Sequence, residues 1–135
     1  MTPKEKALKI LSADRFAVSS GIELTEAAAG YAVCSLRITE NHFNAGGAVQ
    51  GGAIFTLADT AFAMAANNQG NLTVSVSNSI SYLKGTKGHT LYATAKLKSA
   101  SKRLSNYEVE VTDNLDQLIA TMTVTGYITG KQHSE

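Results

Sequence analysis

A single carboxylate interrupts the most apolar stretch of this sequence. Between Gly51 and Asn67 nearly every side chain is apolar, and Asp59 is the only charged residue. An ionised carboxylate in apolar surroundings is costly unless it is hydrogen-bonded, paired or at the wall of a cavity. Two uses are therefore open for Asp59. It either bonds the backbone N–H groups of a neighbouring loop, or acts as a nucleophile or general base.

A glycine-rich segment leads directly into this stretch. Residues 41–52 read Asn-His-Phe-Asn-Ala-Gly-Gly-Ala-Val-Gln-Gly-Gly. If a helix begins there, its free N–H groups and positive dipole end would favour an anion or a developing oxyanion. A nucleotide phosphate loop would need Gly-Lys-Ser/Thr, or a GxGxxG turn after a strand, and neither is present. A carbonyl oxygen is therefore the better-fitting occupant.

Periodicity predicts the element that carries these residues. Residues 51–67 are expected to form one long helix, ended by the Asn-Asn-Gln-Gly sequence at 67–70. Because this helix is apolar nearly all round, we expect a sheet to wrap around it. Its polar positions fall on one stripe, which is predicted to face a wet region. These positions are Thr56, Asp59, Thr60 and Asn67.

The rest of the chain predicts a short helix and six strands. A capping box at residues 2–5, with proline at the first helical position, predicts a helix over about 3–14. Alternating patterns predict strands from Ile22 onward, at 31–39, 72–83, 90–99, 105–113 and 117–129. Residues 130–135 are expected to be a flexible tail. The expected fold class is α+β, with one domain over residues 1–135.

Strict alternation in the strand after the helix separates two faces. Val74, Val76, Asn78, Ile80 and Tyr82 would lie on one side, and Ser75, Ser77, Ser79 and Ser81 on the other. The serine face is predicted to be solvated, because alternating serine is ordinary on a half-exposed sheet. None of these serines lies in a Gly-x-Ser-x-Gly elbow, which argues against a serine hydrolase.

Composition limits the possible partners. Twelve Lys and Arg against eleven Asp and Glu give a net charge of +1 over 135 residues, so no global field favours nucleic acid or a membrane surface. Cys34, the only cysteine, has no intrachain disulfide partner and falls on an apolar strand face, where a core role is expected. The three histidines lack zinc-site spacing. We expect a cytoplasmic protein without a metal or a membrane segment.

Residues 44–67, with Gly51-Gly52, Phe55 and Leu57-Ala58-Asp59, closely resemble the hotdog-fold acyl-CoA thioesterases of the PaaI-like, phenylacetate-pathway group. The resemblance extends from about residue 16 to residue 129 and includes Ile-Ser-Tyr-Leu-Lys at 80–84. It implies a hotdog fold, in which a six-stranded antiparallel sheet wraps around the central helix. It also implies hydrolysis of acyl-CoA or aryl-CoA thioesters, with no cofactor beyond the coenzyme A of the substrate.

The same resemblance implies roles for individual residues. The Gly51 N–H would bind the oxyanion, Asp59 would be the nucleophile or general base, and Asn44 would help place the thioester or the attacking water. Family members often have histidine where this chain has Gln50, and proline where it has Gly85. Substrate contacts are expected from Gln50, Gly52, Thr60, Ala63, Asn78, Lys84, Lys102 and Arg103, of which the last three are candidates for the CoA phosphates.

Two other lysines are expected to have a simpler role. Lys96 and Lys98 are predicted to lie opposite Glu108 and Asn106 in a cross-strand ladder on the exposed face.

The spacing of Gly51 and Asp59 predicts a shared site. Eight residues of regular helix separate them by about 12 Å along the axis at 1.5 Å per residue. One reacting carbonyl must lie ~3 Å from both the donor and the carboxylate or its water. If both residues are catalytic, they must come from two subunits of a homodimer. The family resemblance implies the same, often as a tetramer of two dimers.

Two alternatives stay open at this point. A non-catalytic acyl-CoA-binding module would tolerate loss of Asp59. An enoyl-thioester hydratase would pair its acid with a histidine, and only His42 is near the glycine-rich segment.

Overall fold

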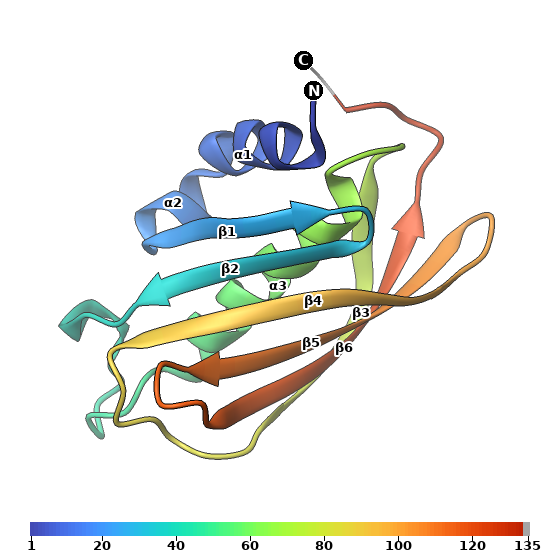
Figure 1. The fold of residues 1–135 in the computed structure, drawn as a ribbon. Coiled ribbons are helices and arrows are strands. Elements are labelled where there is room, and N and C mark those ends of the chain that lie inside the picture. Colours follow the sequence, from blue (N-terminus) through green and yellow to red (C-terminus); the bar gives the residue numbers. More distant parts are fainter. Residues whose placement is uncertain (134–135) are drawn as a thin grey trace.

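The computed structural model describes residues 1–133 (Figure 1). Two helices, α1 (Pro3–Ala13) and α2 (Arg15–Ser19), precede the sheet, and the long helix α3 (Gly51–Asn67) follows the second strand. A short 3-10 helix, η1 (Glu40–His42), lies between that strand and α3. The strands are β1 (Ile22–Ala28), β2 (Tyr31–Arg37), β3 (Thr73–Tyr82), β4 (Thr90–Ala100), β5 (Leu104–Asp113) and β6 (Leu118–Ile128).

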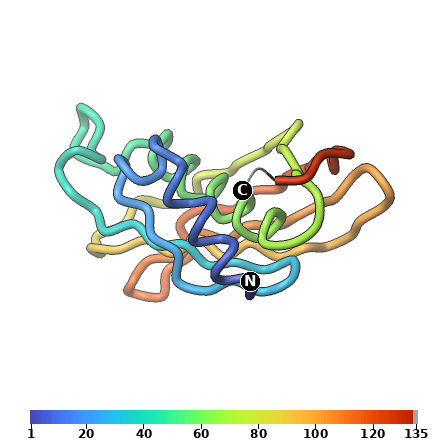
Figure 2. Tube along the Cα trace, turned by 90° about the horizontal axis from the view of Figure 1, so that it is seen from above, coloured from blue at the N-terminus to red at the C-terminus, as the bar shows by residue number. Residues whose placement is uncertain are grey.

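The six strands form one antiparallel sheet in the order β1-β2-β4-β5-β6-β3. The sheet curves around α3, which contacts all six strands (Figures 1 and 2). This confirms the α+β class with one central helix, and it leaves β1 and β3 as the two edges of the sheet.

The core lies between α3 and the inward-facing residues of the strands. Leu57, Ala58, Ala61 and Phe62 of α3 are almost fully buried, and the Phe62 ring meets Tyr107 edge to face at 5.2 Å between ring centroids. Cys34 is completely buried, and desolvation raises the pKa of its thiol to about 12. Its predicted role as a small core residue is confirmed.

Two of the four polar positions on α3 are not wet. Thr60 and Asn67 are each 5% exposed. The Thr60 hydroxyl donates to the Thr56 carbonyl oxygen at 2.7 Å, as threonine often does inside a helix. The predicted wet stripe is therefore wrong at these two residues, because local backbone partners satisfy their side chains.

Asn67 joins the end of α3 to the start of β3. Its Oδ1 accepts from the Thr73 N–H at 2.8 Å, and its Nδ2 donates to the Thr73 carbonyl oxygen at 2.9 Å. Asn67→Ala leaves both backbone groups buried without partners, so we expect a loss of about 2–6 kcal/mol of unfolding free energy, at 1–3 kcal/mol per orphaned group. Urea unfolding measures it, with Asn71→Ala on the exposed turn as the control. A loss below about 0.5 kcal/mol, the usual range for surface changes, would contradict this role.

A β-bulge changes which faces the residues of β3 occupy. The register with β6 shifts between Ser75 and Ser77, so that Val76 has no direct partner. Thr73 is buried and Ser75 half-buried on the helix side before the bulge, whereas Val74 is 42% and Val76 59% exposed. The predicted strict alternation is therefore wrong in this strand, since one extra residue places Ser75 on the same face as Asn78.

The structure describes the N-terminal helix and the first part of the predicted tail. The capping box at Thr2 and Glu5 is present, but α1 stops at Ala13 because Asp14 leaves the helical conformation and caps α2. In the predicted tail, the Lys131 carbonyl oxygen accepts from the Leu72 N–H at 2.9 Å. Residues 134–135 of that tail lie outside the described residues. No helix within residues 1–133 has the length and apolar character needed to span a bilayer.

Candidate active site

Asn44 organises the glycine-rich loop before α3. Its Oδ1 accepts from the N–H groups of Gly46 at 2.9 Å and Ala48 at 3.1 Å, and its own N–H donates to the Ala48 carbonyl oxygen at 2.7 Å. The Asn44 side chain is exposed, and its Nδ2 has no hydrogen-bond partner among residues 1–133. Asn44 thus uses its oxygen to hold the loop and keeps its amide N–H groups as donors.

His42 has a structural role at the start of this loop. Its Nδ1 accepts from the Thr39 N–H at 2.9 Å, and its Nε2 pairs with the Ser20 carbonyl oxygen at 2.7 Å. With both ring nitrogens engaged, His42 ties the loop to the end of α2. Neither ring nitrogen is then free to act as a catalytic base.

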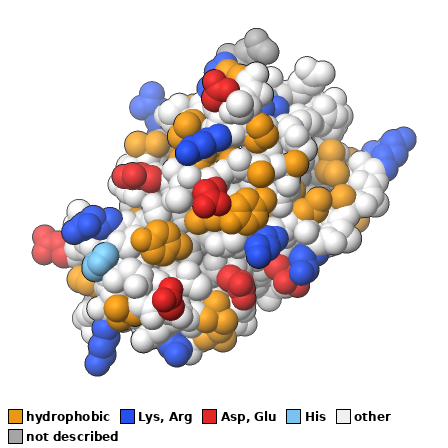
Figure 3. Space-filling view, in the orientation of Figure 1, with side chains coloured by type: hydrophobic (Ala, Val, Ile, Leu, Met, Phe, Trp, Pro, Cys, Tyr) orange, Lys and Arg blue, Asp and Glu red, His pale blue; other side chains and the backbone are white. Residues whose placement is uncertain are grey.

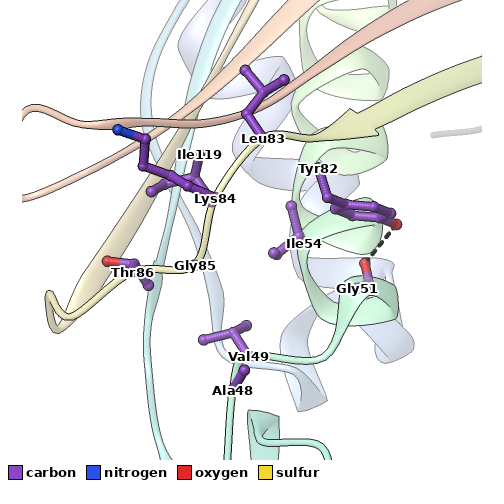
Figure 4. A pocket seen from close by; sticks show the side chains of 10 residues that line it. All are labelled: Ala48, Val49, Gly51, Ile54, Tyr82, Leu83, Lys84, Gly85, Thr86 and Ile119. Atoms are coloured by element: carbon purple, nitrogen blue, oxygen red, sulfur yellow. Dashed lines mark hydrogen bonds between the residues drawn. The ribbon is translucent and has the colours of Figure 1, made fainter.

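The N-terminal turn of α3 presents two N–H groups. Gly51 N–H donates to the side-chain Oε1 of Gln50 at 3.0 Å, while Gly52 N–H has no acceptor among the described residues. On the other side of the turn, the Tyr82 hydroxyl donates to the Gly51 carbonyl oxygen at 3.0 Å (Figure 4). A Cβ at position 51 would lie 3.1 Å from Cζ of the Tyr82 ring, so glycine allows this close contact and a larger residue would have to displace the ring.

A cavity of about 350 Å³ opens beside this turn (Figure 4). Its walls are mainly apolar, and the turn of α3 meets the segment after β3 across it. Lys84 is the one charged residue among those that line it. The lining residues are Ala48, Val49, Gly51, Ile54, Tyr82, Leu83, Lys84, Gly85, Thr86 and Ile119. An apolar chain with one polar contact point fits such walls.

Asp59 lies further along α3, half-buried against β3. Its Oδ1 is buried without a hydrogen-bond partner among the described residues. Desolvation raises the pKa of Asp59 above its ordinary value of 3.8, a hydrogen bond from the Ser75 side chain opposes this shift, and the nearby charge of Asp14 reinforces it. Asn78 Nδ2 in turn donates to Ser75 Oγ at 3.5 Å. Burial thus destabilises the charged form of this carboxylate, and the Ser75 hydroxyl partly offsets that effect. Carboxylates perturbed in this way are often found at functional sites.

These surroundings predict opposite pH shifts for two variants. If Asp59 is the general base or the nucleophile, it must be ionised to act, and the acidic limb of kcat/KM should then follow its raised pKa. Ser75→Ala removes a hydrogen bond to the charged form and should move that limb to higher pH. Asp14→Asn keeps a good helix cap but removes the negative charge, and should move the limb to lower pH. A shift of the acidic limb in the same direction in both variants would contradict this account.

Within one chain, most of the predicted site residues lie in two places, the start of α3 and the middle of α3. Gln50, Gly51, Gly52 and Lys84 gather at the start of α3, whereas Asp59 does not line the cavity there. Asp59 and Ala63 lie half-buried in the middle of α3, and the exposed Asn78 of β3 bonds Ser75, which lies beside Asp59. Thr60, predicted to line the pocket, is buried and bonded within the helix.

Two predicted phosphate contacts lie apart from the residues at the start and in the middle of α3. Lys102 and Arg103 occupy the β4–β5 hairpin, near the end of α3 away from Gly51 (Figure 1). The cross-strand ladder between β4 and β5 differs in register from the prediction. A bulge pairs Asn106 with Ser99 instead of Lys98, and Lys98 Nζ lies 3.5 Å from Glu108 Oε2. Lys96 lies opposite Glu108 as predicted. Acidic and basic side chains are interspersed over the face of the molecule seen in Figure 3.

Ser75 and Tyr82 were not among the predicted site residues. The alternating pattern predicts Ser75 on the solvated face, because nothing in that pattern marks the bulge at Val76. Tyr82 had a detectable signal, an aromatic residue at the end of the strand that follows the helix, but its contact with Gly51 joins residues 31 positions apart.

No group of three or more His, Cys, Asp or Glu residues within residues 1–133 is arranged to hold a metal ion.

An antiparallel six-stranded sheet around one long helix defines a hotdog protein, and this site lies on the central helix. The model of the thioesterase superfamily matches residues 46–120, more than half of the chain. The acyl-coenzyme A thioesterase PaaI of Escherichia coli is 33% identical over 124 residues, covering 87% of this chain and 89% of that protein. The chain therefore belongs to the thioesterase superfamily, and within it to the PaaI-like group of hotdog enzymes.

Solved structures agree with this assignment. The E. coli PaaI protein from the phenylacetic acid degradation operon superposes with a TM-score of 0.93 at 28% identity, over 98% of this chain and 96% of that one. A Streptococcus mutans protein bound to acetyl CoA superposes with a TM-score of 0.78 at 27% identity, over 83% of this chain and 91% of that one.

A further relative is known by its sequence similarity. A putative esterase of Archaeoglobus fulgidus is 37% identical over 99 residues, which are 73% of this chain and 64% of that protein.

Proposed function

We propose that this protein hydrolyses acyl-CoA or aryl-CoA thioesters to the free acid and CoA. The observation that carries the proposal is Asp59, a half-buried carboxylate with an unpartnered oxygen and a raised pKa on the same helix as the Gly51 donor. Similarity to the E. coli acyl-CoA thioesterase supports it, as does similarity to the S. mutans protein bound to acetyl CoA.

In the proposed reaction, the thioester carbonyl oxygen accepts from the Gly51 N–H. Negative charge develops on that oxygen as the carbonyl carbon is attacked, and one such donor contributes about 3 kcal/mol in the transition state. Asp59 either attacks the carbon or takes a proton from the attacking water. The C–S bond then breaks, and the thiolate of CoA leaves with its electron pair and takes up a proton. In the general-base route the acid is then released, whereas in the nucleophilic route the acyl group stays on Asp59 as a mixed anhydride, which water hydrolyses to the acid and the free carboxylate. The bound CoA belongs to the substrate, so the proposal includes no cofactor.

We further propose that two subunits build each site. Asp59 lies about 12 Å along α3 from Gly51, and it does not line the cavity at Gly51. The edge strand β3 runs beside both Gly51 and Asp59, and it exposes Val74 and Val76. Pairing of two β3 edges about a two-fold axis would set the Gly51 turn of one chain against Asp59 of the other. A tetramer would be a pair of such dimers.

Lys84 is the proposed first contact for the CoA phosphates, because it lies on the cavity wall. Lys102 and Arg103 would reach the same substrate only from another subunit. The proposal also keeps the expected cytoplasmic location.

Asn44 allows its two roles to be separated. Asn44→Asp keeps an oxygen that accepts from Gly46 and Ala48 but removes the amide donors, whereas Asn44→Ala removes both. If the donors place the thioester or the water, both variants should lose about tenfold or more in kcat/KM, the cost of a hydrogen bond to a developing charge. Only Asn44→Ala should also loosen the loop, measured by faster amide exchange at Gly46 and Ala48. Full activity of Asn44→Asp would contradict the donor role.

The proposed function is tested by thiol release from a panel of CoA esters. The panel contains short-, medium- and long-chain acyl-CoAs together with phenylacetyl-CoA and hydroxybenzoyl-CoA. We expect turnover of at least one ester, and the best substrate defines the acyl group. No release from any ester by a folded oligomer would overturn the proposal.

Two further readouts identify the alternatives if thiol release fails. Hydration of an enoyl-CoA without thiol release would indicate a hydratase. Tight ester binding without turnover, unchanged in Asp59→Asn, would indicate a binding module.

A further inference from the structure

The donor assigned to the oxyanion is already occupied in the free protein. Gly51 N–H donates to Gln50 Oε1 at 3.0 Å, so a side-chain amide oxygen stands where the thioester oxygen would accept. An N–H group carries one proton and gives a strong, well-aligned hydrogen bond to one acceptor at a time. A substrate carbonyl at Gly51 therefore has to displace the Gln50 side chain.

We infer that Gln50 is a displaceable cap on the oxyanion donor, which substrates with a carbonyl oxygen at this position must remove. This inference rests on the proposed function. It assigns Gln50 a competing role, in contrast to the direct substrate contact expected from the sequence.

The cap can move while its backbone stays fixed. The Gln50 N–H donates to the His42 carbonyl oxygen at 2.7 Å, and the Gln50 carbonyl oxygen accepts from Ala53 at 2.9 Å and Ile54 at 3.2 Å. The side chain is exposed, and the bond to Gly51 is the only one it makes to residues 1–133. Rotation of that side chain therefore breaks one hydrogen bond and leaves the loop and the helix start intact.

The donor itself is held still. The Tyr82 hydroxyl bonds the Gly51 carbonyl oxygen at 3.0 Å, and the ring packs against the Gly51 backbone. The backbone of residue 51 is thus bonded to β3 through its carbonyl oxygen, and its N–H is covered by an exposed side chain. A ligand that offers an acceptor oxygen at this point must replace the hydrogen bond from Gly51 to Gln50, whereas a ligand that offers none can leave that bond in place.

The cap is tested first in the free protein, by NMR of the Gly51 amide. The wild type is compared with Gln50→Met, which keeps the length of the side chain but removes the acceptor. We expect an upfield shift of the Gly51 amide proton and faster exchange with solvent in Gln50→Met, while the Ile54 amide stays unchanged. An unchanged Gly51 amide would overturn the cap, because it would show that Gln50 Oε1 does not cover the donor.

Competition is tested with two non-hydrolysable ligands. One is the ketone analogue of hexanoyl-CoA, in which CH2 replaces the sulfur and the carbonyl oxygen remains, and the other is the thioether S-hexyl-CoA, which lacks that oxygen. Calorimetry gives the ratio of their Kd values for each protein. The ratio cancels effects that a variant has on CoA or chain binding in general.

The expected changes in that ratio have opposite signs. Gln50→Met should favour the ketone by about threefold, since loss of one neutral hydrogen bond frees the donor. Gln50→Glu should disfavour it by about tenfold, because a carboxylate is a stronger acceptor at a helix N-terminus. If Gln50→Met instead weakens ketone binding, Gln50 is a substrate contact and the cap is overturned.

These outcomes separate the cap from the proposed function. Ligand discrimination that follows the cap, in a protein without thiol release, would refute hydrolysis and retain the cap. If thiol release occurs but the ratio of the two Kd values is the same in the wild type and in both Gln50 variants, hydrolysis is retained and the cap is refuted. No thiol release from the ester panel, together with an unchanged Gly51 amide in Gln50→Met, would refute both.

Discussion

Asp59→Asn is expected to lose at least ~100-fold in kcat, the low end for a positioned general base, while the folded protein becomes more stable. The amide cannot attack the thioester or take a proton from water. It also carries no charge, so the desolvation that raises the pKa of Asp59 no longer acts against folding. Activity and stability should therefore change in opposite directions.

The sign of the stability effect follows from proton linkage. A folded-state pKa above the unfolded value means that folding favours the protonated form of Asp59. The wild type is therefore penalised at pH values above the folded pKa and loses that penalty as the pH falls to 3.8 and below. Asp59→Asn should have the higher Tm at pH 7, and its advantage should shrink in acid.

Thiol release and thermal unfolding measure the two effects. Asp116→Asn is the matched control, because it removes the same charge from an exposed turn with φ of 61°, a conformation that asparagine tolerates. It should leave turnover unchanged. Turnover of Asp59→Asn within tenfold of the wild type would remove Asp59 from the chemistry, whatever its Tm.

Two inactive variants are expected to regain activity when their chains assemble together. Gly51→Leu crowds the donor turn, since even a Cβ at position 51 lies 3.1 Å from the Tyr82 ring. In a mixed dimer, the Asp59→Asn chain supplies an intact Gly51 and the Gly51→Leu chain supplies an intact Asp59. One of its two sites is then complete, which is impossible in either parent.

Random assembly sets the size of the recovery. In an equal mixture half of the dimers are mixed, and each has one complete site of two, so activity should reach about a quarter of the wild type in a two-fold dimer. Native mass spectrometry verifies that mixed dimers form. Mixed dimers without recovered turnover would show that Gly51 and Asp59 do not share a site across the interface.

Local sequence signals were sufficient for the architecture of this protein. The apolar run at 51–67 predicted the central helix, and alternation predicted the six strands around it, because both periods are properties of neighbouring residues. The unusual carboxylate at Asp59 and the glycines at 51 and 52 could be recognised for the same reason. Their separation along one helix was enough to predict that two subunits contribute.

The tertiary structure decided the details of the site. The bulge at Val76 brought Ser75 beside Asp59, and the pairing of Asn67 with Thr73 removed a polar side chain from solvent. Tyr82 reached Gly51 across 31 residues. Such contacts depend on how a strand lies against a helix, and a one-residue slip in register changes them without altering the periodicity of either segment. The sequence by itself therefore determined which elements form and which groups are chemically unusual, whereas packing determined which of those groups meet.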